Sequence, residues 1–217
     1  ADSSVLVVDI GGGTTDFSLI GVDNKDGNME LQRLAVGNHL LLGGDNMDFT
    51  LAYAMQQKLG KRLNPRQFSS LVHQCRQAKE RILGEEALEK IDITILGTGS
   101  SLIGGSLKAE LTQEEVDQFI IQAFLPECDL NHEVQRQQRS GLRSFGLNFE
   151  SDAAISRHLA EFLKNNDKMP KTVLFNGGVT KAKQLRQRVS SIISTWSGEE
   201  IDVLADSNPD LAVAKGA

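Results

Sequence analysis

The sequence contains only two cysteines in 217 residues, Cys75 and Cys128. Their spacing matches neither a metal-ligand pair nor a redox motif. We therefore expect ordinary thiols, buried or partly buried, of the kind found in a reducing cytoplasm. The histidines are also few, and their scattered positions form no ligand pattern. They are His39, His73, His132 and His158.

Long hydrophobic runs are absent as well. No apolar run approaches the roughly 20 residues of a membrane span, and the first short run, residues 5–8, lacks the length and basic flank of a signal peptide. A net charge of −6 and a pI near 5.3 argue against non-specific binding to nucleic acid or anionic membranes. With 40% hydrophobic and 24% charged residues, the composition predicts one globular domain or two small subdomains, with neither nucleic acid nor membrane as a partner.

The most informative motif lies near the start of the chain. An apolar strand pattern ends on a carboxylate, three glycines and two hydroxyls follow, and a second carboxylate opens another strand pattern. In order these residues are 5–8, Asp9, Gly11, Gly12, Gly13, Thr14, Thr15 and Asp16. Backbone N–H groups of such a glycine turn can converge on a phosphate, and the acidic residues can hold hydrated Mg²⁺.

The motif has two other interpretations. A tight hairpin can need glycine for its turn alone, and a Walker or dinucleotide loop leads into a helix, whereas a strand pattern follows here. The motif therefore predicts a phosphate-and-magnesium loop at the tip of a strand hairpin. We expect no structural partner for the Asp9 carboxylate, because it ends a strand beside three glycines.

Hydrophobic periodicity, capping residues and prolines predict the remaining elements. Further strands are expected at 17–22, 29–37, 90–96, 106–111, 171–175 and 201–204. Helices are expected at 49–59 with Asp45 or Asn46 as N-cap, at 65–83, at 112–124 from a Thr112–Glu115 capping box, at 151–165 capped by Ser151, at 180–196, and from Asn208. This order predicts a layered α/β domain.

The motif from Asp9 to Asp16 resembles the second phosphate motif of the actin-like ATPase superfamily, and its Gly-Gly-Gly-Thr form resembles that of the 70-kDa heat-shock chaperones. Residues 42–48, Leu-Gly-Gly-Asp-Asn-Met-Asp, are similar to the family signature Leu-Gly-Gly-Glu-Asp-Phe-Asp. The junction at 177–181 resembles the family's adenosine motif Gly-Gly-Ser-Thr-Arg, with valine and lysine at the serine and arginine positions. Taken alone, this junction can also be a plain strand–helix turn.

Two more motifs follow in family order. In the helix at 75–83, Lys79 matches the family's nucleoside-facing lysine, whereas Arg76 stands at its glutamate position and Glu80 at its arginine position. An Arg76–Glu80 ion pair at i, i+4 can survive with its signs exchanged; the alternative is a solvated helix face. Residues 208–217 resemble the family's Asn-Pro-Asp-Glu-Ala-Val-Ala-x-Gly-Ala, in which Asp210 helps to close the site.

The resemblance implies an actin-like ATPase (ribonuclease H-like) lobe with an inserted α+β subdomain. Residues 1–44 and 112–217 form the lobe core, 45–111 the inserted subdomain and 127–150 an irregular surface insertion. This arrangement matches the second lobe of the family's nucleotide-binding domain, and the long insertion suggests a divergent bacterial-type relative. The chain starts without methionine and stops inside an expected helix, so we expect a piece of a longer protein.

The implied function is binding of ATP or ADP with Mg²⁺ in a chaperone ATPase. Asp9 and Thr14 would be catalytic, and Asp9 and Asp16 would hold Mg²⁺ through water. The expected nucleotide contacts are Gly11, Gly12, Gly13, Thr15, Arg76, Lys79, Gly177, Gly178, Lys181 and Asp210. Adenine recognition should be weaker than in the family, since Lys181 and Glu80 replace the two arginines that sandwich the base.

The resemblance also implies partners. They are the first lobe of the same polypeptide, a substrate-binding domain with unfolded clients, and a co-chaperone or nucleotide-exchange factor. The whole protein would hydrolyse ATP, whereas this lobe alone is expected to be inactive. An actin-like filament or division scaffold is the alternative function, and a sugar or acetate kinase is a third that lacks a substrate signature.

Overall fold

The structure is a computed structural model that describes residues 3–25, 27–97, 105–135 and 150–204. Its larger sheet is mixed and has the order β3-β2-β1-β6-β7. The hairpin strands β1, β2 and β3 are antiparallel, while β6 and β7 run parallel to β1. The strands are β1 (Ser3–Ile10), β2 (Thr15–Lys25), β3 (Asn28–Val36), β6 (Thr172–Asn176) and β7 (Asp202–Val203). The expected α/β class is confirmed, and the predicted strands lie close to these bounds.

Strand alternation decides which side chains reach the core. In β1 the side chains of Leu6, Val8 and Ile10 are buried, whereas Asp9 points to the opposite face of the sheet. The parallel partner β6 repeats the pattern, and its Asn176 pairs with Asp9 in register. One strand end therefore supplies both core packing and a polar group beside the glycine turn.

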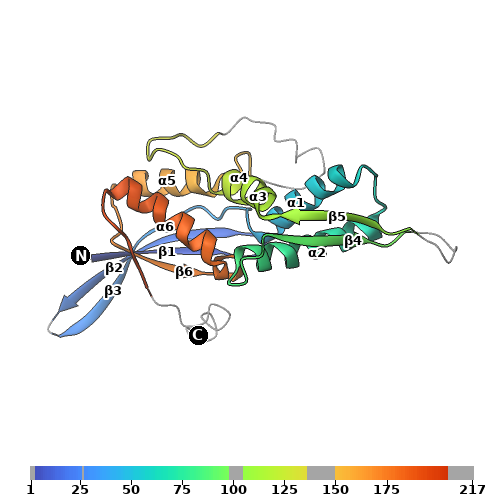
Figure 1. Cartoon of the computed structure of the whole chain (residues 1–217). Helices are drawn as coiled ribbons and strands as arrows, with labels where there is room; N and C mark the ends of the chain where they lie inside the picture. The colour runs from blue at the N-terminus through green and yellow to red at the C-terminus, as the bar shows by residue number, and fades with distance from the viewer. Residues whose placement is uncertain (1–2, 26, 98–104, 136–149, 205–217) are drawn as a thin grey trace.

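A second group of elements packs together at the end of the molecule away from the β2–β3 hairpin (Figure 1). It contains two helices and a two-stranded antiparallel sheet, joined by contacts of α1 with α2 and β5, and of α2 with β4. The elements are α1 (Gly44–Leu59), α2 (Pro65–Leu83), β4 (Lys90–Ile95) and β5 (Leu107–Thr112). The predicted bounds of α2 are confirmed at both ends, since Asn64 accepts from the Gln67 N–H at 3.0 Å and Pro65 occupies the first helical turn.

The Thr112–Glu115 capping box is also present. The Glu115 N–H donates to Thr112 Oγ1 at 3.2 Å, and the Thr112 N–H donates to Glu115 Oε2 at 2.9 Å. The helical stretch that follows contains a π-helical segment, which the periodicity did not predict. Its parts are α3 (Gln113–Val116), η1 (Asp117–Ile121) and α4 (Gln122–Phe124).

Two predicted helix starts are wrong. α5 (Ile155–Asn165) begins after Ala154 rather than at Ser151. The reason is that the buried Asp152 carboxylate accepts from the N–H groups of Gln135 and Ala154, both at 3.0 Å, and holds the preceding segment out of the helix. After β6 a 3₁₀ turn, η3 (Gly178–Lys181), comes first, and α6 (Lys183–Ser197) begins only beyond it.

Within the described ranges, each helix is too short or too polar to cross a bilayer. In the predicted 127–150 insertion, residues 127–135 contain no helix or strand. Its remainder to residue 149 and the predicted helix from Asn208 lie outside the described residues.

Candidate functional site

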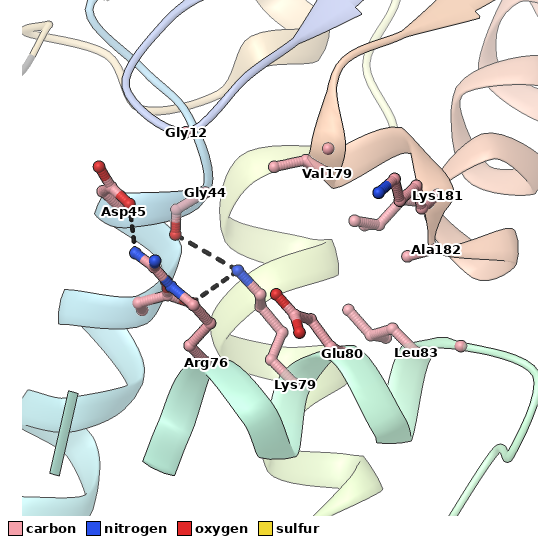
Figure 2. A pocket seen from close by; sticks show the side chains of 14 residues that line it. Gly12, Gly44, Asp45, Arg76, Lys79, Glu80, Leu83, Val179, Lys181 and Ala182 are labelled. Atoms are coloured by element: carbon pink, nitrogen blue, oxygen red, sulfur yellow. Dashed lines mark hydrogen bonds and ion pairs between the residues drawn. The ribbon is translucent and has the colours of Figure 1, made fainter. Parts of the chain in front are cut away.

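A cavity of about 420 Å³ collects residues from four separate parts of the chain. Its walls come from the glycine turn after β1, the start of α1, the second half of α2 and the turn after β6 (Figure 2). The lining residues are Gly12, Gly44, Asp45, Asp48, Arg76, Lys79, Glu80, Leu83, Gly84, Gly178, Val179, Lys181, Ala182 and Leu185. All four sequence motifs that lie in the described residues therefore meet at one cavity.

The glycine turn lies directly against the N-terminus of α1. The Gly44 N–H donates to Gly11 O at 3.0 Å, and the Asp45 N–H donates to Gly12 O at 2.7 Å. A Cβ on Gly43 would lie only 2.5 Å from Gly12 O, so this approach requires glycine. The predicted N-cap at Asp45 or Asn46 is wrong because these turn carbonyls already satisfy the first helical N–H groups, and the helix starts at Gly44.

The glycine turn also carries backbone N–H donors. Among the described residues, no hydrogen bond uses the backbone N–H groups of Gly12, Gly13 or Thr14. Gly12 and Gly13 are exposed, and Gly12 lines the cavity. Adjacent unpaired N–H groups on a turn are suited to binding an anion.

Asp9 and Asp16 are direct cross-strand partners of β1 and β2. The Asp9 carboxylate accepts from Asn176 Nδ2 at 2.7 Å, so the expectation that Asp9 has no structural partner is wrong. Asp16 Oδ1 lies 2.7 Å from His39 Nδ1. Two like charges directly opposite each other destabilise a sheet unless a positive group lies near them.

Gly177 lies at the carboxyl end of β6, in close contact with Ile10 and Asp9 of β1. It has φ +87°, and a Cβ there would lie 2.3 Å from Ile10 O and 2.7 Å from Asp9 Oδ1. Gly178 lines the cavity, and a Cβ added to it would meet no atom within 4 Å. The 3₁₀ turn η3, rather than the N-terminus of α6, therefore comes directly after these two glycines, unlike the strand–glycine–helix junction that the sequence predicted.

A buried ion-pair network forms the wall between α1 and α2. Asp48 is 1% exposed, and its Oδ2 accepts from Arg76 Nε at 2.6 Å. Lys79 Nζ lies 2.6 Å from Asp48 Oδ1, in a contact that is not aligned as a hydrogen bond, and donates to Gly44 O at 3.3 Å. Arg76 also pairs with Asp45. The hydrogen bond to Asp48 is the main reason why the pKa of Arg76 is raised.

The ion pairs that Arg76 of α2 forms differ from the one that the sequence predicted. In the described part of the chain, no ion pair joins Arg76 to Glu80, so the predicted i, i+4 pair is replaced by contacts of Arg76 with α1. Arg76, Lys79 and Lys181 all line the cavity, and their role as nucleotide contacts stays a prediction. Asp48 was missed as a site residue. Asp48 lies three residues after Asp45, and this spacing places both carboxylates on one face of a helix. The spacing could therefore have indicated Asp48 as a site residue.

Thr15 does not reach the cavity. Its side chain is fully buried, and its Oγ1 donates to Leu42 O at 2.8 Å. Thr14 is half-buried at the turn, and its carbonyl accepts from the Gly11 N–H at 2.8 Å. Asp210 lies outside the described residues.

Both cysteines are at least partly buried. Burial, followed by the charge of Asp48, raises the pKa of Cys75 to about 12, which keeps this thiol protonated and confirms an ordinary buried cysteine. Cys128 is partly buried, and burial raises its pKa as well. Across the described ranges, no group of three or more His, Cys, Asp and Glu side chains could hold a metal ion directly.

Comparison with known proteins identifies the family. The family model described as "Hsp70 protein" matches residues 1–125, which include the glycine turn, α1 and α2. The chain belongs to the Hsp70 family. It is 25% identical to a mitochondrial-type heat shock protein 70 of Encephalitozoon hellem and 26% identical to the chaperone protein DnaK of Carsonella ruddii, each over 100% of this chain and 31% of the relative.

Other Hsp70 relatives give a similar result. A chaperone protein HscA homolog of Acidithiobacillus ferrooxidans is 30% identical over 97% of this chain and 27% of its own length. This Hsp70 chain thus spans about a third of the curated relatives that it matches. Their names, chaperones and heat-shock proteins, favour the chaperone expectation over the actin-like scaffold.

Proposed function

We propose that this Hsp70 chain is the second lobe of the nucleotide-binding domain of a chaperone ATPase, and that its cavity binds ATP or ADP. The observation that carries the proposal is the run of backbone N–H groups of Gly12, which lines the cavity, and of Gly13 and Thr14 beside it, for which the described part of the chain offers no hydrogen-bond acceptor. Hydrogen bonds from such donors to charged phosphate oxygens are about twice as strong as neutral ones. Gly178, across the cavity, leaves room for the ligand.

Asp9 and Asp16 are the residues proposed to hold the magnesium ion in this site. Mg²⁺ keeps several of its waters and is bound through one or two carboxylates together with phosphates. A hydrated ion would offset the repulsion between the two cross-strand carboxylates. Asn176 and His39 orient the carboxylates by hydrogen bonding to them. Thr14, at the end of the donor row, is the residue proposed to contact the terminal phosphate.

The remaining phosphate contacts are assigned to a companion lobe on the same polypeptide. The group formed by α1, α2, β4 and β5 is proposed to be the inserted subdomain, residues 45–111, on an actin-like lobe core. In the whole protein, nucleotide turnover would drive binding and release of unfolded clients, with a co-chaperone or exchange factor, in the cytoplasm. Each lost charge-assisted hydrogen bond is worth about 1.5–3 kcal/mol, so this chain alone should not turn over ATP.

The test is Asp9→Asn in the full-length protein that carries this chain. The asparagine oxygen can still accept from Asn176, so the free energy of unfolding should change by less than about 0.5 kcal/mol. Single-turnover hydrolysis at saturating Mg²⁺ should fall by at least about a hundredfold. Asp92→Asn is the matched control, because Asp92 faces Glu110 across β4 and β5 in the same like-charge arrangement. Equal hydrolysis by Asp9→Asn and Asp92→Asn would reject a magnesium role for Asp9.

A further inference from the structure

A second cavity, of about 190 Å³, lies between α5 and the loop at 37–40 that follows β3. Within the described chain its lining residues differ from those of the first cavity. The loop packs directly on two aromatic rings, since a Cβ on Gly37 would lie 3.3 Å from Phe162 Cδ2 and 3.4 Å from Phe17 Cβ. The walls of this cavity are therefore held in place by the packing of the loop on β2 and α5.

The polar groups of this cavity present hydrogen-bond acceptors. His158 Nε2 donates to Asp152 O at 2.9 Å, so Nδ1 of the neutral imidazole is an acceptor. Asn166 Nδ2 donates to Phe162 O at 2.7 Å, and the amide oxygen of Asn166 remains an acceptor. The ionised carboxylate of Glu161 also only accepts hydrogen bonds. All three residues line the cavity, which therefore suits a ligand rich in N–H donors.

The charge of the surroundings favours a cation. α5 ends at Asn165 with Asn166 as its C-cap, and both residues line the cavity. The C-terminal end of a helix carries a partial negative charge that stabilises nearby cations. Glu161 adds a formal negative charge, and within the described ranges no Lys or Arg side chain lines this cavity. A positively charged group would therefore be complementary to these walls.

The aromatic wall distinguishes one cation from another. Phe17 and Phe162 line the cavity with their ring centroids 5.9 Å apart, and they are otherwise buried. A guanidinium group is planar, carries five N–H donors and stacks on aromatic faces, whereas an ammonium group is a compact and more strongly hydrated charge. Val36 and Leu40 add apolar surface against which the methylene stem of a long side chain can pack. We infer that this cavity is a binding site for an arginine side chain of a protein partner.

The arginine is assigned to a polypeptide because the α-carboxylate of the free amino acid would meet the same acceptors and the negative charge of Glu161. The site also lies next to one of the proposed magnesium residues. The loop carries His39, whose Nδ1 lies 2.7 Å from Asp16 Oδ1, and Phe17 follows Asp16 on β2. A partner's arginine would thus contact both segments that flank Asp16. Its binding does not require nucleotide, so this site can be tested separately from the proposed nucleotide site.

Titration of the ¹⁵N-labelled 217-residue chain with short peptides tests the site by NMR. The tripeptide acetyl-Gly-Arg-Gly-amide should shift the amides of Gly37, Asn38 and Asn166, which line the cavity. The same peptide with citrulline has nearly the same shape but no charge. It should bind at least about tenfold more weakly, because hydrogen bonds that involve an ionised group are the stronger ones. The lysine peptide and free arginine should also bind more weakly than the arginine peptide.

Glu161→Gln should weaken binding of the arginine peptide roughly tenfold, because it removes the formal charge from the cavity. Glu114→Gln is the matched control, since Glu114 is an exposed helical glutamate outside the cavity lining. It should leave the affinity unchanged. If Glu161→Gln fails to fold, the comparison of the arginine and citrulline peptides on the unaltered chain decides.

Arginine-selective shifts at the cavity that Glu161→Gln weakens and Glu114→Gln preserves would support the inference. Equal binding of the arginine and citrulline peptides, or shifts confined to another surface, would overturn it. Equal losses in the two variants would overturn it as well. Free arginine that binds as tightly as the peptide would contradict a protein partner.

Discussion

Asp9 and Asp16 face each other across the β1–β2 hairpin, directly below the glycine turn. Each carboxylate has a partner at 2.7 Å, Asn176 Nδ2 for Asp9 and His39 Nδ1 for Asp16. The fold thus keeps two carboxylates side by side, next to the backbone N–H groups of Gly12, Gly13 and Thr14, which make no hydrogen bond within the described ranges. A hydrated cation with a phosphate would complement both sets of groups.

Thr14→Ala should affect the rate of hydrolysis more than the binding of ATP. A hydroxyl that contacts the terminal phosphate gains most in the transition state, where charge on that group is redistributed. In the full-length protein we expect the hydrolysis rate constant to fall roughly tenfold or more, with less than about a threefold change in Kd. Thr14→Ser, which keeps the hydroxyl, should stay near wild type. Equal losses in rate and binding for Thr14→Ala would contradict a transition-state contact.

Gly177→Ala should destabilise the fold, whereas Gly178→Ala should not. At Gly177 the backbone has φ +87°, and a Cβ would lie 2.3 Å from Ile10 O. We expect a loss of at least about 2 kcal/mol in the free energy of unfolding for Gly177→Ala. The new Cβ of Gly178→Ala meets no atom within 4 Å, so its effect should stay within about 0.5 kcal/mol. Urea denaturation measures both, and equal stabilities would show that the β6–β1 junction is not tightly constrained.

Lys79→Met tests the buried network. Without the ammonium group, the buried Asp48 carboxylate loses one of the two cations that pair with it in the described part of the chain, and Arg76 remains. Breaking a buried pair from one side costs about 3 kcal/mol or more. Lys25→Met, which removes the exposed Lys25–Glu30 pair, should cost less than about 1 kcal/mol. Thermal or urea unfolding of the two variants would reveal a structural role for Lys79, and similar small losses would contradict it.

The proposed subdomain at residues 45–111 should open independently of the main sheet. Its helices and its two-stranded sheet pack mainly on one another. Native-state hydrogen exchange should show amides of α2, β4 and β5 exchanging through an opening of lower free energy than amides of β1 and β6. One uniform opening across both groups would argue against a separate unit.

The sequence predicted those parts that depend on short-range signals. Pro65 at the first helical turn and the Thr112–Glu115 capping box placed their helices correctly, and the apolar run at 5–8 located the strand that ends at the glycine turn. The glycine positions were enough to locate the turn. Each of these features depends on residues within a few positions of one another.

The rest depends on contacts between distant segments. Arg76 pairs with Asp48, 28 residues away, rather than with Glu80 on its own helix. The start of α1 is set by carbonyls of the glycine turn, and Ser151 fails as a cap because Asp152 binds the Gln135 N–H. Local propensities carry no information about such partners, so the network around Asp48 became visible only in the folded structure.

The most direct test of the nucleotide site is NMR of the 217-residue chain labelled with ¹⁵N. Titration with millimolar MgADP reports weak binding even without a companion lobe. We predict that the largest amide shift changes occur at Gly12, Gly13 and Thr14, with further changes at Gly178. Unchanged amides at the glycine turn, with either no binding or shifts confined to another surface, would contradict the assignment of this cavity as a nucleotide site.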